Sequence, residues 1–520
     1  MDSVAARSIE DLPQRFNAAC DLIDHNLAAG RGGKAAVIDY RGPLTYAELA
    51  ERVDRMASVF SRLGVKCEQR ILLCLLDTAD FPTVFLGAIK AGVVPVPVNT
   101  LLTADDYRFL IEDSRAAAVF VSGELAPQWA RIAEDFPDRI FVSSGGGPWP
   151  ALEALLSESA PQRHAAQTCR DEVAFWLYTS GSTGRPKAAM HAHGSLRLTA
   201  NLFGLSVAGY REDDVVLSVA KQFFAYGLGN ALTFPYAAGA TAVLNKERAT
   251  PEIITGLIRA HKVSVLGGVP TFFAGWYASG HAPTRADVPH LRIATSAGEP
   301  LPAHLGEEFF RRYGADVIDG LGSTEMLHIY VSQRPGEVRY GCAGRAVPGY
   351  ELRIVDEDGN PAAPGEIGEL HVRGPTSAIG YWNDRAKSRR TFLGEWTRTG
   401  DSFSCDADGW YIYGGRRDDM LKVGGIYVSP TEVEEALSCH EAVLEVAVVG
   451  AGDGDGLTKP VAHIVLKPGL LPNPALEIEL KALAKARLAP YKYPRWIVFT
   501  DALPKTATGK IQRFLLRKSV

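Results

Sequence analysis

The chain has 520 residues, with 55 basic and 60 acidic side chains and a net charge of −5. That balance lacks the bulk basic excess of a nucleic-acid-binding protein, and a content of 46% hydrophobic and 22% charged residues excludes disorder as the main state. At about 150 residues per domain, the length predicts about three to four domain-sized units.

Several features predict a cytoplasmic location. Seven scattered cysteines without a C-x-x-C pair predict reduced thiols rather than a disulfide framework or a zinc cluster. The N-terminal segment has early acidic side chains and no apolar core, unlike a secretory signal. No apolar run reaches the length of about 18 residues that a membrane-spanning helix needs. We therefore expect a cytoplasmic protein that binds neither nucleic acid nor a membrane.

The N-terminal part alternates helix-like and strand-like segments. Residues 44–64 carry apolar side chains at helical spacing, and the apolar run 71–76 predicts a buried strand. A second helix-like stretch, FPTVFLGAIKAG, leads to the strand-like VVPVPVN. This alternation predicts an α/β fold in which helices cover parallel sheets.

The pattern changes twice towards the C-terminus. Shorter strands joined by D-G turns are predicted in YELRIVDEDG, GEIGELHVRGP and GWYIYGG, and their pairing is expected to be antiparallel. After Gly415, the helix-like TEVEEALSCHEAV and EIELKALAKARL flank the strand-like VLEVAVVGA and KPVAHIVLKPG, as in a small α+β domain. We predict an N-terminal domain at residues 1–416 and a C-terminal domain at residues 417–520.

The most informative segment is the glycine-rich run YTSGSTGRPK at residues 178–187. Its glycines let backbone N–H groups converge on a phosphate, its hydroxyls add donors, and Lys187 adds a cation. The run is not a Walker loop, because Pro186 occupies the place of the second glycine. A nucleotide site is predicted after an apolar strand, and Ser195 is expected to cap the helix that follows.

The segment YTSGSTGRPKAAMH resembles the phosphate loop of the adenylate-forming enzymes, which include acyl- and aryl-CoA synthetases, luciferases and peptide-synthetase adenylation domains. Further segments resemble that family's motifs in the same order: SAGEP (296–300), DGLGSTE (319–325), RTGD (398–401), GGRRDDMLKVGG (414–425) and PKTATGK (504–510). The resemblance spans roughly residues 20–515. It implies parallel-rich α/β subdomains, a small β-barrel-like subdomain and a small, mobile α+β C-terminal domain.

The resemblance also implies two half-reactions, with ATP, Mg²⁺ and coenzyme A as cofactors. A carboxylate attacks the α-phosphate of ATP, and the thiol of coenzyme A then displaces AMP. Two like charges about 4 Å apart repel by roughly 4 kcal/mol at an effective dielectric of about 20, so the site requires cations and oriented donors. The residues implied to bind ATP or AMP are Thr179, Ser180, Gly181, Ser182, Thr183, Gly184, Lys187, Gly298, Glu299, Pro300, Asp319, Gly320, Leu321, Gly322, Ser323, Asp401 and Arg416.

By the same resemblance, three residues are expected to be catalytic. Glu325 is the expected Mg²⁺ ligand, Thr324 offers its hydroxyl to the α-phosphate, and Lys510 is a mobile cation for adenylation. Asp401 is expected to accept both ribose hydroxyls, and Arg416 to reach the ribose or a phosphate.

Other implied roles concern the adenine and the acceptor. Asp319 and the backbone of 298–300 are expected to frame the adenine, and Leu321 stands where relatives often carry an aromatic side chain. Asp418 occupies the family's hinge position, while Gly424 and Gly425 lie on the loop expected to line the coenzyme A tunnel.

The segments 221–230 and 326–330 resemble the benzoate-CoA ligase branch, which predicts an aromatic acid as substrate. Bulky aromatic side chains leave little room for a long alkyl chain. Benzoate, 2-aminobenzoate and hydroxybenzoates are not distinguished. The expected pocket has Phe224 as a gate to the tunnel, a wall of Ala225, Tyr226 and Gly227, and His328 with Ile329 opposite.

The leading interpretation is therefore an aryl-CoA ligase of the AMP-forming type. One alternative is an enzyme that adenylates an aryl acid and loads a separate carrier protein. Another is a catalytically silent binding protein, which the presence of Lys187, Glu325, Asp401 and Lys510 disfavours. A homodimer is compatible with the resemblance.

Overall fold

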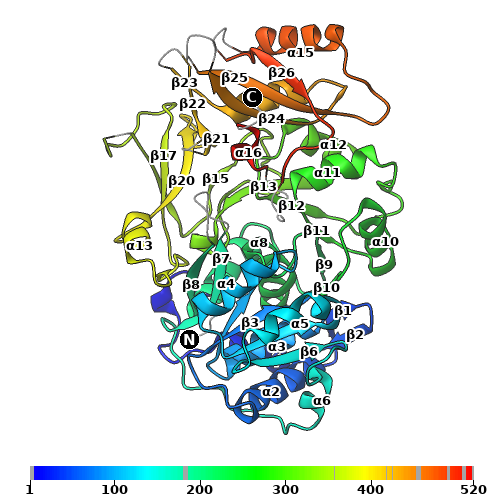
Figure 1. Cartoon of the computed structure of the whole chain (residues 1–520), viewed down its shortest axis with the longest axis vertical. Helices are drawn as coiled ribbons and strands as arrows, with labels where there is room; N and C mark the ends of the chain where they lie inside the picture. Colours follow the sequence, from blue (N-terminus) through cyan, green and yellow to red (C-terminus); the bar gives the residue numbers. More distant parts are fainter. Residues whose placement is uncertain are drawn as a thin grey trace.

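The computed structural model describes residues 5–179, 186–356, 358–416, 419–423, 426–452, 458–488, 492–505 and 511–517. Figure 1 shows a large body built from the N-terminal part of the chain, with the C-terminal residues, in orange and red, packed on one end of it. Among the described residues, no helix is both long and apolar enough to cross a membrane.

A four-stranded parallel sheet lies near the N-terminus, as the alternating pattern predicts. Its order is β4 (Val94–Pro97), β3 (Arg70–Cys74), β5 (Ala118–Ser122) and β6 (Ile140–Ser144). Thr45 begins α2 with a capping box, because its Oγ1 accepts the N–H of Glu48 at 3.2 Å. The helices of this region are α1 (Ala18–Ala28), α2 (Tyr46–Arg62), α3 (Asp80–Lys90), α4 (Ala104–Ser114), α5 (Ala126–Glu134) and α6 (Leu152–Ser157).

A nine-stranded sheet, parallel at its centre and antiparallel at both edges, forms the second layer. Its order is β15 (Arg345–Ala346), β14 (Ile329–Ser332), β13 (Asp316–Gly322), β12 (Ile293–Ala297), β11 (Val265–Gly268), β9 (Val215–Ser218), β10 (Thr241–Val243), β1 (Ala35–Asp39) and β2 (Gly42–Thr45).

Helices cover one face of this sheet. Trp276 and Phe309 are fully buried among the apolar side chains between them. Burial of such aromatic surface is the main stabilising contribution at this layer. The covering helices are α10 (Pro251–His261), α11 (Pro270–Ala278) and α12 (Ala303–Tyr313).

A short antiparallel sheet carries the glycine-rich loop. Its order is β18 (Gly380–Tyr381), β8 (Lys187–Ala192) and β7 (Val173–Thr179). Thr179 pairs with Lys187, so the two strands meet at the base of the loop that joins them. The strand predicted before the loop is therefore present.

The cap predicted at Ser195 is wrong. Helix α7 (His193–Thr199) starts directly after β8 with Ala192 as its N-cap, and Ser195 is buried inside the helix. The carbonyl of Glu172 accepts the N–H of His193 at 3.0 Å, and that of Arg170 accepts the N–H of Gly194 at 2.9 Å. Because backbone carbonyls satisfy these first-turn amides, no side-chain cap is needed.

Irregular helical segments connect α7 to the nine-stranded sheet. Two of them are π-helical turns, a geometry that often occurs at functional sites. In chain order they are η4 (Ala200–Leu205), α8 (Ala225–Leu228), η5 (Gly229–Thr233) and α9 (Phe234–Ala238).

The predicted antiparallel strands form a five-stranded sheet of the small β subdomain. Strand β20 is central and pairs with three others. The elements are β16 (Glu351–Val355), β17 (Gly368–Arg373), α13 (Arg385–Thr391), β19 (Phe392–Leu393), β20 (Trp396–Cys405) and β21 (Tyr411–Arg416).

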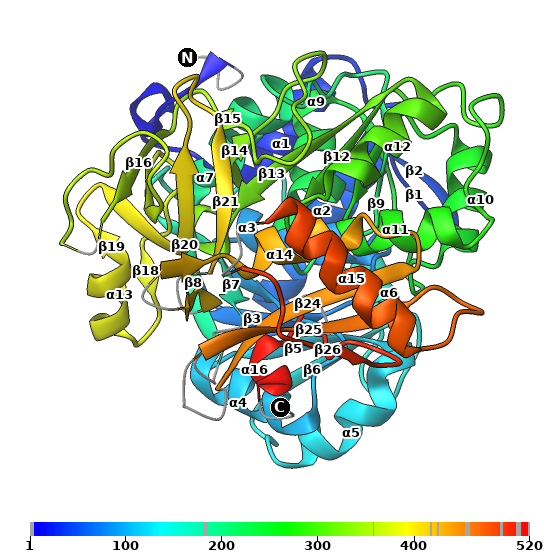
Figure 2. The same ribbon diagram turned by 90° about the horizontal axis from the view of Figure 1, so that it is seen from above.

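The C-terminal part has its own apolar core, in which Val433, Val448 and Leu480 are buried. Figure 2 shows its strands and α15 lying across the end of the larger body. The predicted boundary at residue 416 coincides with the end of β21. The elements are β22 (Leu421–Val423), β23 (Ile426–Val428), α14 (Pro430–Ser438), β24 (Val443–Gly452), β25 (Thr458–Leu466), α15 (Pro474–Arg487), β26 (Trp496–Phe499) and α16 (Arg513–Leu516).

Candidate active site

The carboxyl ends of β12 and β13 position the predicted nucleotide residues. In these parallel strands Ser296 pairs with Asp319 and Ala297 with Gly320, so SAGEP and DGLGSTE leave the sheet side by side. Ligands of open parallel sheets bind at such carboxyl ends. The two segments, distant in sequence, therefore form one edge of a common site.

Asp319 holds the backbone that follows residues 298–300, the segment predicted to frame the adenine. Its Oδ2 accepts the backbone N–H of Leu301 at 3.1 Å, which holds the chain directly after Pro300. Asp319 is buried, and this burial raises the pKa of its carboxyl to about 7. In this structure the side chain shapes the 298–300 segment by holding its end.

The turn after β13 presents Thr324 and Glu325. It is a single 3₁₀ turn, Thr324–Met326, capped by the Oγ of Ser323, which accepts the N–H of Met326 at 3.3 Å. Leu327 then has φ +68° and ψ −43°, a strained backbone conformation for a residue with a side chain. Such strained residues concentrate at functional sites, and Leu327 lies between the turn and His328.

The Glu325 carboxylate is held from outside its own turn. Tyr381 donates its hydroxyl to Glu325 Oε1 at 2.7 Å. Lys187 lies near enough for the Glu325 charge to oppose the lowering of the Lys187 pKa, which burial and the neighbouring Lys387 cause. The predicted metal ligand and the cation of the phosphate loop therefore share one environment.

A single carboxylate suits Mg²⁺, which commonly takes one or two protein oxygens together with phosphate oxygens and water. Among the described residues, no three His, Cys, Asp or Glu side chains gather as a ready-made metal cluster. Within the same part of the chain, Glu325 Oε1 accepts one hydrogen bond, and a carboxylate has lone pairs for further ligands. The donor set thus fits a metal that arrives with a nucleotide.

Asp401 and Arg416 meet across the β20–β21 pair. Arg416 Nη1 donates to Asp401 Oδ1 at 3.0 Å, and Asp401 N–H donates to Thr399 Oγ1 at 3.1 Å. The Asp401 carboxylate is buried, whereas the Arg416 side chain is 45% exposed. Asp401, predicted to contact the ribose, and Arg416, predicted to reach the ribose or a phosphate, are therefore neighbours, and Arg416 orients the carboxylate through Oδ1.

His328 stands in an aromatic environment beside Tyr226. The ring centroids of Tyr226, Phe203 and Phe234 lie 5.5, 5.3 and 4.6 Å from the His328 ring. Burial lowers the pKa of His328 to about 3, so the imidazole is neutral at physiological pH. Its Nε2 lies 3.3 Å from the backbone carbonyl oxygen of Tyr226.

The remaining residues predicted for the acid pocket lie on α8 and at the start of β14. Phe224 is the N-cap of α8 and packs edge-on against Phe223, and Ala225 opens the same helix. Ile329 is buried over Gly320. A Cβ on Gly227 would lie 1.9 Å from the carbonyl oxygen of Lys221, so Gly227 is required for the close approach of the preceding loop.

Sequence reasoning missed three residues of this region. The Tyr226 hydroxyl lies 2.7 Å from Thr295 Oγ1 on β12. A Cβ on Gly229 would lie 2.4 and 2.5 Å from atoms of the His328 ring, so only glycine leaves that ring its place. Tyr381 was missed because it lies 56 positions from Glu325. The second glycine of the A-Y-G-L-G run could have indicated Gly229, whereas no local signal in the sequence indicates Thr295 or Tyr381.

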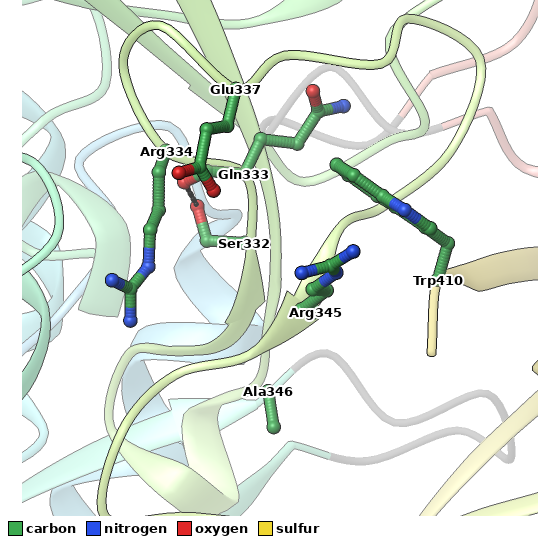
Figure 3. A pocket seen from close by; sticks show the side chains of 7 residues that line it. All are labelled: Ser332, Gln333, Arg334, Glu337, Arg345, Ala346 and Trp410. Atoms are coloured by element: carbon green, nitrogen blue, oxygen red, sulfur yellow. Dashed lines mark hydrogen bonds between the residues drawn. The ribbon is translucent and has the colours of Figure 1, made fainter. Parts of the chain in front are cut away.

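A separate cavity of about 280 Å³ lies beside β14 and β15 (Figure 3). Arg345 lies against the ring of Trp410 in its lining, with the guanidinium carbon 4.7 Å from the ring centroid. None of the residues predicted for the acid pocket lines it. The lining residues are Ser332, Gln333, Arg334, Glu337, Arg345, Ala346 and Trp410.

Some predicted site residues lie outside the described residues. Among them are the five central residues of the phosphate loop, the hinge, the tunnel glycines and the C-terminal lysine. They are Ser180, Gly181, Ser182, Thr183, Gly184, Asp418, Gly424, Gly425 and Lys510.

The chain belongs to the AMP-binding enzyme family, whose pattern matches residues 25–382, and residues 432–510 match the AMP-binding enzyme C-terminal domain. The benzoate–CoA ligase of Thauera aromatica is 53% identical over 98% of this chain and 97% of its own. Among solved structures, a benzoate CoA ligase from Burkholderia xenovorans is 50% identical, with a TM-score of 0.92 over 96% of this chain and 100% of its own.

An anthranilate CoA ligase in complex with anthranoyl-AMP is 39% identical, with a TM-score of 0.95 over 98% of each chain. These likenesses confirm the predicted adenylate-forming superfamily and the predicted α/β fold with its additional C-terminal domain.

Proposed function

We propose that this chain is an aryl-CoA ligase that converts a benzoate-type acid, ATP and coenzyme A into aryl-CoA, AMP and pyrophosphate. Its relatives support a coenzyme A ligase over an enzyme that loads a carrier protein. The observation that supports an aromatic substrate is the group of rings around His328. In this group the centroid of the neutral imidazole lies 5.5 Å from that of the Tyr226 ring. Flat, apolar faces of this kind suit a planar ring.

In the first half-reaction, an oxygen of the carboxylate forms a bond to the α-phosphorus, and the bond from that phosphorus to pyrophosphate breaks. Lys187 and Arg416 both lie near enough to Glu325 to interact with its charge, so both supply positive charge at the turn that carries Thr324. The Thr324 hydroxyl donates to the α-phosphate. Bound Mg²⁺, held by Glu325, would screen the phosphate charge that repels the carboxylate.

In the second half-reaction, the thiol of coenzyme A loses its proton to solvent and its sulfur forms a bond to the carbonyl carbon. The bond from that carbon to the phosphate oxygen of AMP breaks, and AMP leaves with the electron pair. Asp401 holds the ribose of the leaving AMP through its vicinal hydroxyls. Lys510 serves the first half-reaction, and the loop with Gly424 and Gly425 serves the second after rotation about Asp418. We also propose that the enzyme uses Mg²⁺, forms a homodimer and is located in the cytoplasm.

The neutral state of His328 bears on the choice of acid. An uncharged imidazole cannot form an ion pair with the substrate carboxylate. With its Nε2–H donated to the Tyr226 carbonyl, its Nδ1 can accept one hydrogen bond from a ring substituent. A site that pairs with a substituent discriminates strongly against the analogue that lacks it, whereas apolar contact alone discriminates weakly. The other groups around His328 are aromatic rings, whose contacts discriminate weakly, so we expect benzoate and its small ortho-substituted forms to be accepted together.

A panel of acids tests this function. Benzoate, 2-aminobenzoate, the hydroxybenzoates, cinnamate and octanoate are each supplied with ATP and coenzyme A, and AMP and thioester are measured separately. We expect benzoate or an ortho-substituted benzoate to give the highest kcat/KM. Preference for octanoate would contradict the aromatic pocket, and a phosphopantetheine carrier protein that outcompetes coenzyme A as acceptor would support the alternative.

A further inference from the structure

The segment from Thr376 to Tyr381 fastens the turn that carries Thr324 and Glu325. Thr376 Oγ1 donates to the carbonyl of Met326 at 2.8 Å, and Ala378 N–H donates to the carbonyl of Glu325 at 2.7 Å. Tyr381 completes the set through its 2.7 Å hydrogen bond to Glu325 Oε1. Two contacts thus fix the backbone of the turn, and the third fixes a side chain.

The same segment is tied to the strand that leaves the phosphate loop. Ile379 N–H donates to the carbonyl of Met190 at 2.8 Å, and Trp382 N–H donates to that of Ala188 at 2.9 Å. Strand β8 begins at Lys187 and pairs with β18. The segment is therefore bonded both to the Glu325 turn and to the strand that carries Lys187, so a displacement of β18 would disturb both.

The position of the Tyr381 hydroxyl is set by packing. Tyr381 is 6% exposed, and its ring centroid lies 5.3 Å from that of Phe392 beside Ala189 and Ala378. Ser388 Oγ accepts the Tyr381 N–H at 2.9 Å, which fixes the backbone as well. A phenol hydroxyl carries its proton at neutral pH and a carboxylate is an acceptor, so Tyr381 is the donor of this bond.

A glutamate side chain on a short turn has several rotamers. It must be held in one of them before its carboxylate can bind the metal ion of a metal–ATP complex in a single geometry. We propose that Tyr381 is a positioning residue that holds the Glu325 carboxylate for the magnesium complex of ATP. This proposal rests on the assignment of Glu325 as metal ligand and is independent of which acid the enzyme activates.

The test compares Tyr381→Phe with Tyr46→Phe. Tyr46 is buried against Tyr236 and donates its hydroxyl to the carbonyl of Ala240 at 2.7 Å, so this control loses a hydroxyl hydrogen bond that does not involve Glu325. Isothermal titration measures the affinity of each full-length variant for ATP with Mg²⁺ and for AMP without metal. For Tyr381→Phe we expect MgATP affinity to fall about 10- to 100-fold, as for loss of a bond to a charged group.

AMP affinity is expected to stay within about twofold of the parent, because AMP needs no metal. The Mg²⁺ concentration for half-maximal adenylation should rise in the same variant, with KM for the acid unchanged. An equal loss of AMP and MgATP affinity would overturn the proposal in favour of general distortion of the site.

A double-mutant cycle with Glu325→Gln separates positioning from stability. If Tyr381 acts through the carboxylate, Tyr381→Phe should change MgATP affinity much less in the Glu325→Gln background than in the parent. An undiminished effect there would contradict the proposal. Because the titrations contain no acid, a failed acid panel leaves this result interpretable.

Discussion

Replacement of Asp319 by Asn should stabilise the protein, and by more at alkaline than at acidic pH. The Asp319 carboxyl is buried with a pKa of about 7, above its ordinary value of 3.8. A raised carboxyl pKa leaves stability intact at low pH, where the group is protonated in both folded and unfolded states. As pH rises towards 7, the unfolded chain ionises freely while the folded one resists, so stability is lost.

The magnitude follows from that displacement. A carboxyl pKa moved from 3.8 to about 7 corresponds to about 4 kcal/mol once pH exceeds both values. Between pH 5 and pH 8, the stability difference between Asp319→Asn and the parent should grow by about 2–3 kcal/mol. The asparagine Oδ1 can still accept the Leu301 N–H, so the backbone after residues 298–300 keeps this hydrogen bond.

Thermal unfolding of the unliganded proteins at pH 5, 6, 7 and 8 measures this difference. We expect the melting temperature of Asp319→Asn to exceed that of the parent by a margin that widens with pH, by roughly 4–8 °C in total. Asp287→Asn is a control of opposite sign, because hydrogen bonds from Thr284 lower the Asp287 pKa. A margin that is constant with pH would refute the raised pKa of Asp319.

Three further predictions concern the site. Gly229→Ala should raise KM for the aromatic acid at least about tenfold, because its Cβ meets the His328 ring, whereas Gly256→Ala, with nothing within 4 Å, should leave KM unchanged and be neutral or stabilising. Asp401→Asn should raise KM for ATP about 10- to 100-fold in steady-state assays, with KM for the acid unchanged; a reversed pattern would exclude a ribose contact. Lys510→Ala should lose adenylation far more than thioester formation from preformed aryl-AMP, and equal losses would remove its assigned role.

The sequence predicts helices and strands correctly where the spacing of apolar side chains is strongly periodic. The helix predicted over 44–64 is α2 at Tyr46–Arg62, and the strand predicted at 71–76 is β3 at Arg70–Cys74. The helical EIELKALAKARL lies within and just beyond α15 at Pro474–Arg487. Apolar spacing determines which face is buried, so such elements follow from the sequence alone.

The site was predictable only where contiguous motifs carry it. Asp319, Thr324 and Glu325 fall in one motif, and the strand order then places them beside SAGEP. The contacts that orient them are long-range: Tyr381 meets Glu325 from 56 positions away, and Thr295 meets Tyr226 from 69. No local propensity encodes these pairs, since they depend on how separate sheets pack against one another.

The cap expected at Ser195 failed for a related reason. A serine near the start of a helix is a good cap in isolation, but the strand β8 delivers the chain straight into α7. Carbonyls of residues 170 and 172, which lie before β7, then accept the first amides. These long-range hydrogen bonds satisfy the backbone N–H groups that a side-chain cap would otherwise bind.

The most direct test of the account is a crystal structure of the protein with a stable analogue of benzoyl-AMP. We expect the aryl ring to lie against the group formed by Tyr226 and His328, the phosphorus beside Thr324, and the ribose hydroxyls on Asp401. An aryl ring bound elsewhere, for example in the cavity beside Trp410, or a phosphorus remote from Thr324, would contradict it.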